Sequence, residues 1–287
     1  MFLLFSQLVQ QIMPNFVTQR ALYESRERPS KTYSWKVFIF SNIIVEIPWS
    51  VLVATVFFLC WYYPIGYYRN AEWTDTVNVR GLLMWIYMQM FFLFTSTFAV
   101  AIVAAMDSAE TAGNIANLMF SLCLIFCGIL VPYNTLPGFW KFMYRVSPFT
   151  YFVEGILGTA VANTPVSCGP EEFQRFQPPT GQTCGEYMQP YQSSAGGSLL
   201  NPEATADCQF CQLTDTNVFL DQFGIKYGNR WRNIGIIWAF VIVNVIAACG
   251  FYWLGRVPKK SGKEEAKAAK AAKEGEKKGE LTEKRSS

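Results

Sequence analysis

The chain has 287 residues, 51% of them hydrophobic and 16% aromatic, and its formal net charge is +3. So small a net charge indicates no nucleic-acid partner. The sequence contains no histidine. This absence excludes metal sites that need an imidazole ligand, nucleophile pairs of the Ser–His or Cys–His kind, and imidazole proton shuttles.

Apolar blocks long enough to span a bilayer dominate the first half of the chain and return near its end. A spanning helix needs about 20 mostly apolar residues to cross about 30 Å of hydrocarbon. Residues 1–17 are shorter and carry three glutamines, and they show neither the basic n-region nor the small-residue cleavage site of a signal peptide. We expect there the inner half of a spanning helix whose beginning is missing from the chain. Complete spans are expected at residues 35–62, 81–105, 112–131 and 231–254.

Three later segments differ from these spans. Residues 136–160 are aromatic, moderately amphipathic and interrupted by Pro148, which suits a helix lying in or dipping into the membrane interface. Residues 163–229 are polar and rich in proline and glycine. From Arg256 the sequence becomes a charged tail, with partial helix expected around residues 264–273 but no face able to form a core.

The basic residues predict the topology, because loops rich in lysine and arginine face the cytoplasm. Five of these residues lie in segment 18–36 and eleven in the tail from Arg256, whereas the loop 63–80 has two. Placing segment 18–36 inside puts the loop 63–80 outside, the turn 106–111 inside and the polar loop 163–229 outside. The tail then returns to the cytoplasm.

Four cysteines fall in the polar loop that we expect outside, where disulfides persist: Cys168, Cys184, Cys208 and Cys211. Two disulfides are therefore predicted, and sequence does not choose among the three possible connectivities. The C-x-x-C spacing of the last two also occurs in zinc and redox sites. Those alternatives are weaker here, because the chain offers no histidine and no thioredoxin-like pattern surrounds the pair.

One carboxylate, Glu46, lies within the first complete span. A charge in hydrocarbon costs a few kcal/mol or more unless the group is paired, protonated or turned toward the protein interior. A proton or ion relay is one interpretation. The other is a buried interhelical hydrogen bond beside Pro48, whose ring leaves a backbone carbonyl free. We favour the second, because no other acid or base lies at a matching depth.

The segment 18–31 is dense in charges of both signs, among them Glu24, Arg26, Glu27 and Arg28. It is either an interfacial turn that satisfies the positive-inside rule or a docking element for a cytoplasmic partner, and composition does not decide. No phosphate-binding sequence of the form G-x-x-x-x-G-K-[ST] occurs in the chain. ATP-driven transport would therefore need an ATPase located elsewhere.

Several long motifs follow one another in order, and they are MPNFVTQRALYESRERPSKTYSW, SNIIVEIPW, FCGILVP, LPGFWKFMYRVSPFTYFVEGILG, PPTGQTCGEYMQPY, NPEATADCQFC and RWRNIGIIWAF. Together they closely resemble the second transmembrane domain of fungal pleiotropic-drug-resistance ABC transporters, over residues 1–258. Members of that family carry two copies of an ATPase domain followed by six spanning helices. The resemblance implies an all-α membrane domain of a G-type ABC exporter, with about five spanning helices, a re-entrant helix and a disulfide-rich external loop.

The resemblance also implies roles for particular residues. Segment 18–31 matches the family's first intracellular loop, whose short coupling helix contacts the ATPase domain. Glu24, Arg26, Glu27 and Arg28 therefore become candidate relays of the nucleotide state.

The end of the fifth helix matches a part of the family that separates the drug cavity from the exit. Bulky apolar side chains form a plug there, which points to Ile129 and Leu130. The family's cavity is largely apolar and aromatic, so Phe120, Leu124 and Phe126 are further candidates for the substrate pathway.

These expectations divide the chain into four regions. Residues 1–160 hold transmembrane helices, the intracellular loop and the re-entrant helix, and residues 161–229 the external cysteine-containing loop. Residues 230–255 form the last span, and residues 256–287 a charged cytoplasmic tail. We expect a multi-pass protein of the plasma membrane that binds no metal or cofactor itself.

The expected function is that of the permease part of an ATP-driven pump exporting hydrophobic drugs or xenobiotics. Its partners would be nucleotide-binding domains carrying ATP and Mg²⁺, the other transmembrane half, the lipid bilayer and hydrophobic small molecules. Two alternatives are a half-module that pairs with a separate ATPase to export lipid, and a non-transporting membrane adaptor or remnant. A membrane enzyme comes last, because no pair of groups is placed for acid–base or nucleophilic work.

Overall fold

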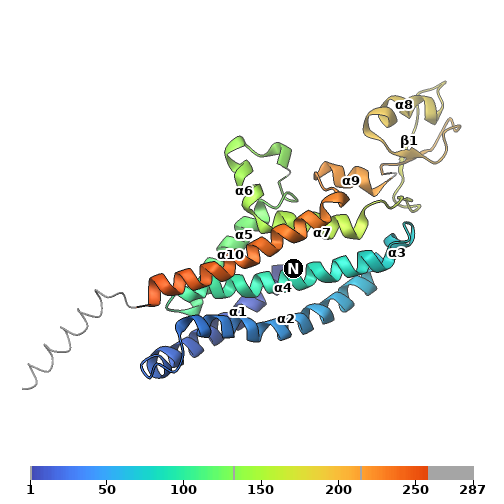
Figure 1. Ribbon diagram of the computed structural model, residues 1–287. Helices are drawn as coiled ribbons and strands as arrows, with labels where there is room; N and C mark the ends of the chain where they lie inside the picture. Colours follow the sequence, from blue (N-terminus) through green and yellow to red (C-terminus); the bar gives the residue numbers. More distant parts are fainter. Residues whose placement is uncertain (1, 132, 214, 258–287) are drawn as a thin grey trace, which may run out of the picture.

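A computed structural model describes residues 2–131, 133–213 and 215–257 of the chain. Long helices run alongside one another in a bundle, and a small subdomain with strands projects from one end (Figure 1). We call this end the disulfide end and the opposite one, where the last helix finishes, the Arg256 end. The helix expected around residues 264–273 lies outside the described residues.

Five long helices make the bundle: α1 (Phe2–Leu22), α2 (Trp35–Ile65), α4 (Val77–Ala105), α5 (Ala109–Ile125) and α10 (Arg230–Arg256). The central one is α4, which packs against the other four and against α7 (Pro148–Val161). In its most apolar stretch 72% of the residues are buried, compared with 17% in α2 and 22% in the last helix. The core of the protein therefore surrounds α4, while α2 and α10 turn most of their apolar surface outward.

Three helices of the described chain are long and apolar enough to cross a membrane: α2, α4 and the helical stretch Tyr227–Arg256. The spans expected at 35–62, 81–105 and 231–254 lie inside these helices. The first helix, α1, continues past residue 17 to Leu22. Its glutamines lower its mean hydropathy, so it is not among the three helices apolar enough to cross a membrane. That α1 is half of a span stays a prediction.

The span expected at 112–131 is wrong at both ends. The helix α5 begins at Ala109, because the Ser108 hydroxyl accepts a hydrogen bond from the Thr111 amide at 3.2 Å and caps the first turn. It ends at Ile125, after which Gly128 has a φ of 91°. A side chain at Gly128 would also lie 2.7 Å from the Tyr144 ring, so the chain turns here on a residue without one.

The aromatic segment 136–160 is broken in two as Pro148 predicts. The short helix α6 (Lys141–Val146) is followed by Ser147, and Pro148 occupies the first turn of α7. Helix α7 buries one face against α4 and α10, and Gly155 allows the closest approach: a Cβ there would be 2.2 Å from Tyr87 Cζ. Its position relative to a membrane interface stays a prediction.

Sequence predicted a polar loop between α7 and α10, whereas the structure contains a small sheet there. The antiparallel strands β1 (Gln174–Phe176), β3 (Cys208–Cys211) and β2 (Ser198–Leu199) lie in that order, next to helix α8 (Cys184–Ala195). Strands of two to four residues are too short to show alternation in the sequence. The remaining elements are α3 (Tyr67–Glu72), α9 (Thr216–Gln222), the π-helical turn η1 (Tyr23–Glu27), and the 3₁₀ turns η2 (Tyr133–Thr135), η3 (Gly138–Trp140) and η4 (Tyr227–Asn229).

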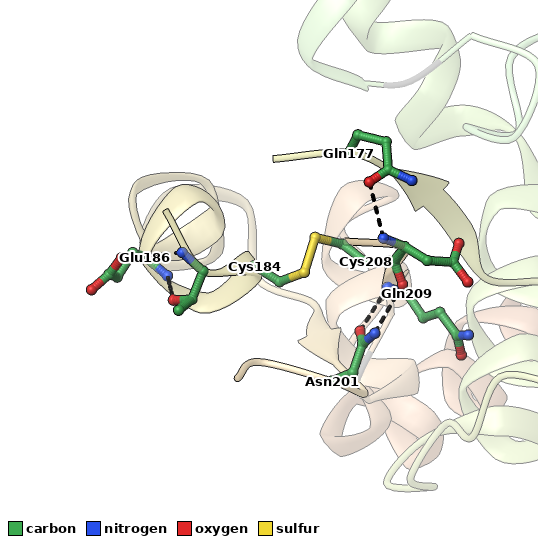
Figure 2. Close-up of a disulfide and its surroundings, with 8 residues drawn as sticks. Gln177, Cys184, Glu186, Asn201, Cys208 and Gln209 are labelled. Atoms are coloured by element: carbon green, nitrogen blue, oxygen red, sulfur yellow. Dashed lines mark hydrogen bonds between the residues drawn. A yellow bond between two sulfur atoms is a disulfide. The ribbon is translucent and has the colours of Figure 1, made fainter. Parts of the chain in front are cut away.

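Two disulfides hold the subdomain together and confirm the expected pairing of the four loop cysteines. Cys168 is joined to Cys211, and Cys184 at the start of α8 is joined to Cys208 at the start of β3. Around the second bridge, Asn201 Oδ1 accepts a hydrogen bond from the Gln209 amide at 2.8 Å, and the Asn201 amide donates to the Asp207 carbonyl (Figure 2). The first disulfide therefore fixes the end of β3 to the segment before β1, and the second fixes the start of β3 to α8.

Arg80 joins this end of the bundle to α7. Its side chain is 2% exposed and donates to the Ala162 carbonyl at 2.7 Å and to the hydroxyls of Thr74 and Thr76. The guanidinium also lies over the Tyr227 ring, 5.2 Å from its centroid. The start of α4, the end of α7 and the residues before α10 are thus held by one side chain.

Removing the Cys184–Cys208 disulfide should loosen the subdomain without unfolding the bundle. For a sequence separation of 24 residues the bridge contributes about 3 kcal/mol. In the double variant Cys184→Ser/Cys208→Ser, we expect trypsin to cut after the exposed Arg175 of β1 faster than in the unmodified chain, as followed on reducing gels. Cys60→Ser, which changes an exposed free thiol, is the matched control. Equal cleavage rates in the three proteins would show that the bridge does not stabilise the sheet.

Candidate functional site

The segment between α1 and α2, to which the resemblance assigns coupling, is anchored on a buried tyrosine. Helix α1 passes directly into the π-helical turn η1. Tyr23, the first residue of η1, is 2% exposed and stacks on Phe38 of α2 at 4.8 Å between ring centroids. Its hydroxyl donates to the Tyr33 carbonyl at 3.3 Å. The loop is therefore fixed to the beginning of α2.

Arg20, one turn before η1, ties the same segment to the end of α4. Its side chain is 3% exposed and donates to the carbonyls of Val103 at 2.8 Å and Asp107 at 3.1 Å. The last carbonyls of a helix lack partners within the helix and carry its partial negative charge, so a cation placed there is stabilising. Arg20 thus links α1 to the α4–α5 turn.

Arg256, the last residue of α10, makes a second link to that turn. Its guanidinium donates to the Met106 carbonyl at 3.0 Å and to the carboxylate of Asp107, and it lies 3.9 Å from the carboxylate of Glu24. The Arg256 carbonyl in turn accepts a hydrogen bond from Arg28 at 2.8 Å. Arg256 therefore joins α10, to which it belongs, to the α4–α5 turn and to the segment after α1.

Tyr252 completes this group of side chains. Its ring is fully buried, and its hydroxyl donates to the Glu24 carboxylate at 3.2 Å. We call the group of Arg20, Glu24, Arg28, Asp107, Tyr252 and Arg256 the Arg256 cluster. Its members come from α1, η1 and the loop after it, the α4–α5 turn and α10, so the cluster joins four parts of the bundle at one end.

The four residues predicted to relay the nucleotide state do not share one environment. Glu24 and Arg28 belong to the Arg256 cluster. Glu27 accepts a hydrogen bond from the Tyr33 hydroxyl, and this bond raises the pKa of Tyr33 to about 12. Arg26 is exposed and has no hydrogen-bond or ion-pair partner in the described part of the chain. Only Arg26 is therefore fully available to another protein, while the other three also organise the loop. Their role in coupling stays a prediction.

Sequence reasoning did not single out Arg20, Asp107, Tyr252 and Arg256 as site residues. It counted Arg20 and Arg256 only toward the positive charge of their loops. The available signal was topological, because segment 18–36, the turn 106–111 and the start of the tail are predicted on one side of the membrane. Which charges meet at that side depends on how the helices pack.

The predicted pathway residues divide into buried and exposed groups. Phe120 of α5 is 1% exposed, and its ring stacks on that of Phe5 of α1 with 3.8 Å between the ring centroids. The ring of Phe149 packs edge-on against it, with 4.7 Å between the centroids. It therefore packs inside the chain, between α1, α5 and α7.

The other candidates lie at or beyond the end of α5. Leu124 is partly buried against the core, and the Phe126 ring stacks on Trp140 at 5.3 Å. In the turn that follows, Ile129 is 44% exposed and Leu130 68% exposed. Two large apolar side chains thus project from a turn, as a plug facing a partner would require, although the plug itself stays a prediction.

A groove of about 360 Å³ runs between α1 and α5. Its lining combines apolar, amide and carboxylate side chains: Val9, Gln10, Met13, Pro14, Ala109, Glu110, Gly113, Asn114 and Asn117. Ser6 donates to Asn117 Oδ1 at 3.2 Å across the same two helices. The substrate-pathway residues do not line this groove, so sequence reasoning chose neighbouring positions on α5 but not this face.

Within the described chain, Glu46 does not make the interhelical hydrogen bond that we favoured. Among the described residues its carboxylate has no hydrogen-bond or ion-pair partner, and it is only partly buried. Instead it lines an open groove between α1 and α2. No helix of the described chain supplies a donor there, because α2 turns most of its surface outward. The interhelical hydrogen bond therefore stays a prediction.

A further polar group, also missed, lies toward the disulfide end of the bundle. The Glu154 carboxylate of α7 accepts hydrogen bonds from Asn229 at 2.6 Å, from Asn233 at 2.9 Å and from Arg232 at 3.2 Å. Its side chain is 11% exposed, and Asn233 is fully buried. This carboxylate holds α7 to the first turns of α10.

Apolar helices around a buried axis, with charged clusters confined to the ends, define a multi-pass helical membrane domain. The chain belongs to the ABC-2 type transporter family, whose model matches residues 1–161, and the model for CDR ABC transporters matches residues 212–278.

Curated relatives agree with this assignment. The chain is 61% identical over 266 residues to ABC multidrug transporter AFR2 of Cryptococcus neoformans, an alignment that covers 93% of this chain and 17% of that protein. It is 59% identical over 256 residues to ABC multidrug transporter C of Aspergillus fumigatus, covering 89% of this chain and 17% of the relative. The chain therefore spans about 17% of the length of these relatives.

Replacing Arg256 should destabilise the Arg256 end of the bundle. Arg256→Ala removes charge-assisted hydrogen bonds to Met106 and Asp107, and we expect a loss of about 2 kcal/mol, seen as a lower thermal midpoint by tryptophan fluorescence in detergent. Arg256→Lys should recover part of the loss, because lysine keeps the charge but not the forked geometry. Arg26→Ala, which changes an exposed and unpaired arginine, should leave the midpoint unchanged. Equal midpoints for Arg26→Ala and Arg256→Ala would contradict the cluster's structural role.

The hydrogen bonds of Glu154 to Asn229, Arg232 and Asn233 offer an independent test of stability toward the disulfide end. Glu154→Ala leaves the buried Asn233 amide without its acceptor, so we expect destabilisation of about 3 kcal/mol. Glu154→Gln keeps one acceptor oxygen and should cost about half as much. Thermal midpoints of the two variants compared with that of Glu186→Gln, whose parent carboxylate caps α8 in the subdomain, test this order. A midpoint for Glu154→Ala as high as that of the unmodified chain would exclude the network as a stabilising contact.

Proposed function

We propose that this chain is the membrane-embedded permease part of an ATP-driven pump that exports hydrophobic drugs or xenobiotics. The Arg256 cluster carries the proposal. Glu24 and Arg28, from the segment predicted to contact an ATPase, are bonded to side chains or carbonyls of α10, and Arg20 is bonded to the α4–α5 turn. A displacement of that segment would therefore reach the ends of three bundle helices.

The relatives support the substrate class, since several of them are multidrug transporters by name. The chain has no phosphate-binding motif of its own. In this proposal ATP and Mg²⁺ bind nucleotide-binding domains outside the chain, and a second transmembrane half completes the pathway. This chain then has no enzymatic activity, and its contribution is to bind, pass and release substrate.

Topology follows from the charges at the bundle ends. The proposal places the Arg256 end and the tail in the cytoplasm and the disulfide subdomain outside, in the plasma membrane. This orientation agrees with the positive-inside rule and with the compartment in which disulfides persist. It also brings the Arg256 cluster to the side on which ATP is available.

A hybrid pump tests the proposal directly. The whole of this chain replaces the matching segment of the Cryptococcus relative, and the hybrid is expressed in yeast that lacks drug pumps of its own. We expect energy-dependent efflux of a fluorescent hydrophobic dye and drug resistance above the empty-vector control. The unaltered relative is the positive control, and a hybrid with an inactive ATPase is the negative one.

Changing the Arg256 cluster within the hybrid separates coupling from assembly. With Arg256→Ala we expect ATP hydrolysis to continue while drug no longer stimulates it, because the α4–α5 turn then loses its side-chain link to α10. A hybrid that reaches the membrane and hydrolyses ATP but exports no dye would refute the proposed function. Movement of a fluorescent phospholipid in place of the dye would favour the lipid-exporting half-module.

A further inference from the structure

The groove that contains Glu46 has an unusual lining for a surface of a membrane helix bundle. It lies between α1 and α2, with Val100 and Phe92 of α4 at its base, and comprises adjoining cavities of about 120 and 390 Å³ that share Ile12, Asn15, Val45 and Glu46. Its walls carry amide, hydroxyl and carboxylate groups from both helices. The groove is therefore polar where lipid would require an apolar surface.

The polar side chains form two rows with helical spacing. On α1 the row is Gln11, Asn15 and Gln19, and on α2 it is Asn42, Glu46 and Ser50. Residues four apart lie on one face of a helix, so each row follows the groove for two turns, roughly 12 Å. The helices run in opposite directions, which places Gln19 near Asn42 at one end of the groove and Gln11 near Ser50 at the other.

Five of these six groups have no hydrogen-bond partner among the described residues. Gln11, Asn15, Gln19, Glu46 and Ser50 have no side-chain hydrogen bond to any described residue. The sixth, Asn42, donates to the Phe38 carbonyl of its own helix at 2.9 Å.

Where α4 packs against α2 and α10, by contrast, polar side chains pair between helices. Gln89 of α4 donates to the Thr55 hydroxyl of α2 at 3.0 Å, and Asn244 of α10 donates to the Thr97 hydroxyl of α4 at 3.4 Å. An unpaired carboxylate among unpaired amides in a spanning segment needs a partner that lies outside this part of the chain.

The dimensions of the groove indicate what the partner is. A small molecule is enclosed by a compact pocket with a few convergent polar groups, whereas here the groups are spread along two turns of two helices and remain open on one side. A third helix lying along the groove matches that length, and interhelical hydrogen bonds of this kind join membrane helices. The relatives are about six times as long as the stretch matched here, so further helices are available to such a pump.

We propose that the groove between α1 and α2 seats a membrane helix from outside this chain, and that this helix directs a basic or amide hydrogen-bond donor at Glu46. The inference rests on the proposed function, because the helix belongs to the rest of the pump. Gln11, Asn15 and Gln19 pair with polar groups on the two turns that flank the donor. The docked helix removes the polar rows from contact with lipid.

Site-specific photo-crosslinking in the hybrid pump tests this. The photoreactive residue p-benzoylphenylalanine is placed at Asn15 or Gln11, and a protease site is inserted just before the first residue of this chain. After irradiation and proteolysis, a covalent bond to the rest of the pump keeps the two fragments together on a denaturing gel. The control position is Ile44 of α2, which is 60% exposed and does not line the groove.

We expect several-fold more crosslinked product from Asn15 and Gln11 than from Ile44. Adding Glu46→Leu should lower the yield at Asn15, and Glu46→Gln, which still accepts a hydrogen bond, should preserve it. Equal yields at Asn15, Gln11 and Ile44 would overturn the proposal, as would a yield at Asn15 that excess transported drug abolishes, since the groove would then be a ligand site. A hybrid that crosslinks but exports no dye would leave the seated helix in place and refute the proposed function.

Discussion

Hydrocarbon offers no hydrogen-bond partner, and this constraint decides how the helices of the bundle are joined. Three arginines that the described chain buries wholly or in part, Arg20, Arg80 and Arg256, lie toward helix ends, where backbone carbonyls are unpaired. Arg80 donates to the carbonyl of Ala162 just beyond α7, and Arg20 and Arg256 donate to carbonyls at and just beyond the end of α4. The interior around α4 is consequently built mainly from apolar and aromatic side chains, and its buried polar groups include the uncharged hydroxyls of Thr95, Ser96 and Thr97.

That arrangement gives the two ends of the bundle different characters. At the disulfide end, Arg80 and Glu154 hold α7 against α4 and α10, and two disulfides fix the small sheet beyond them. At the Arg256 end the bonds join segments that are distant in sequence, without any covalent link. In the proposed pump, this end receives the motion of an ATPase, and contacts that are individually modest can be rearranged in each cycle.

The same constraint makes the exceptions informative. Glu46 and the amides of α1 lie in a groove without partners, and Ile129 and Leu130 project from a turn. An unpaired carboxylate is unfavourable in lipid, and large apolar side chains on a turn are unfavourable in water. Both features are accounted for if neighbouring parts of a larger protein cover them. A chain that spans about 17% of its relatives' length is expected to expose such surfaces.

The sequence predicted much of the site but misplaced some of its contacts. The segment containing Glu24 and Arg28 was identified from its charges and its resemblance, because both are properties of consecutive residues. Its partners Arg256 and Asp107 were not, since they come from other loops. Phe120 was identified as apolar and aromatic, but those properties do not distinguish a cavity wall from packing against Phe5.

By itself the sequence determined that this is a membrane protein, where three of its spans lie, and that four particular cysteines would pair. Those properties depend on composition over about 20 residues or on the presence of a residue type. Only the tertiary structure decided which cysteines pair with which, that α4 is the buried axis, and that Arg256 meets Glu24. Each of these depends on distances between segments far apart in the chain, and local periodicity carries no information about such distances.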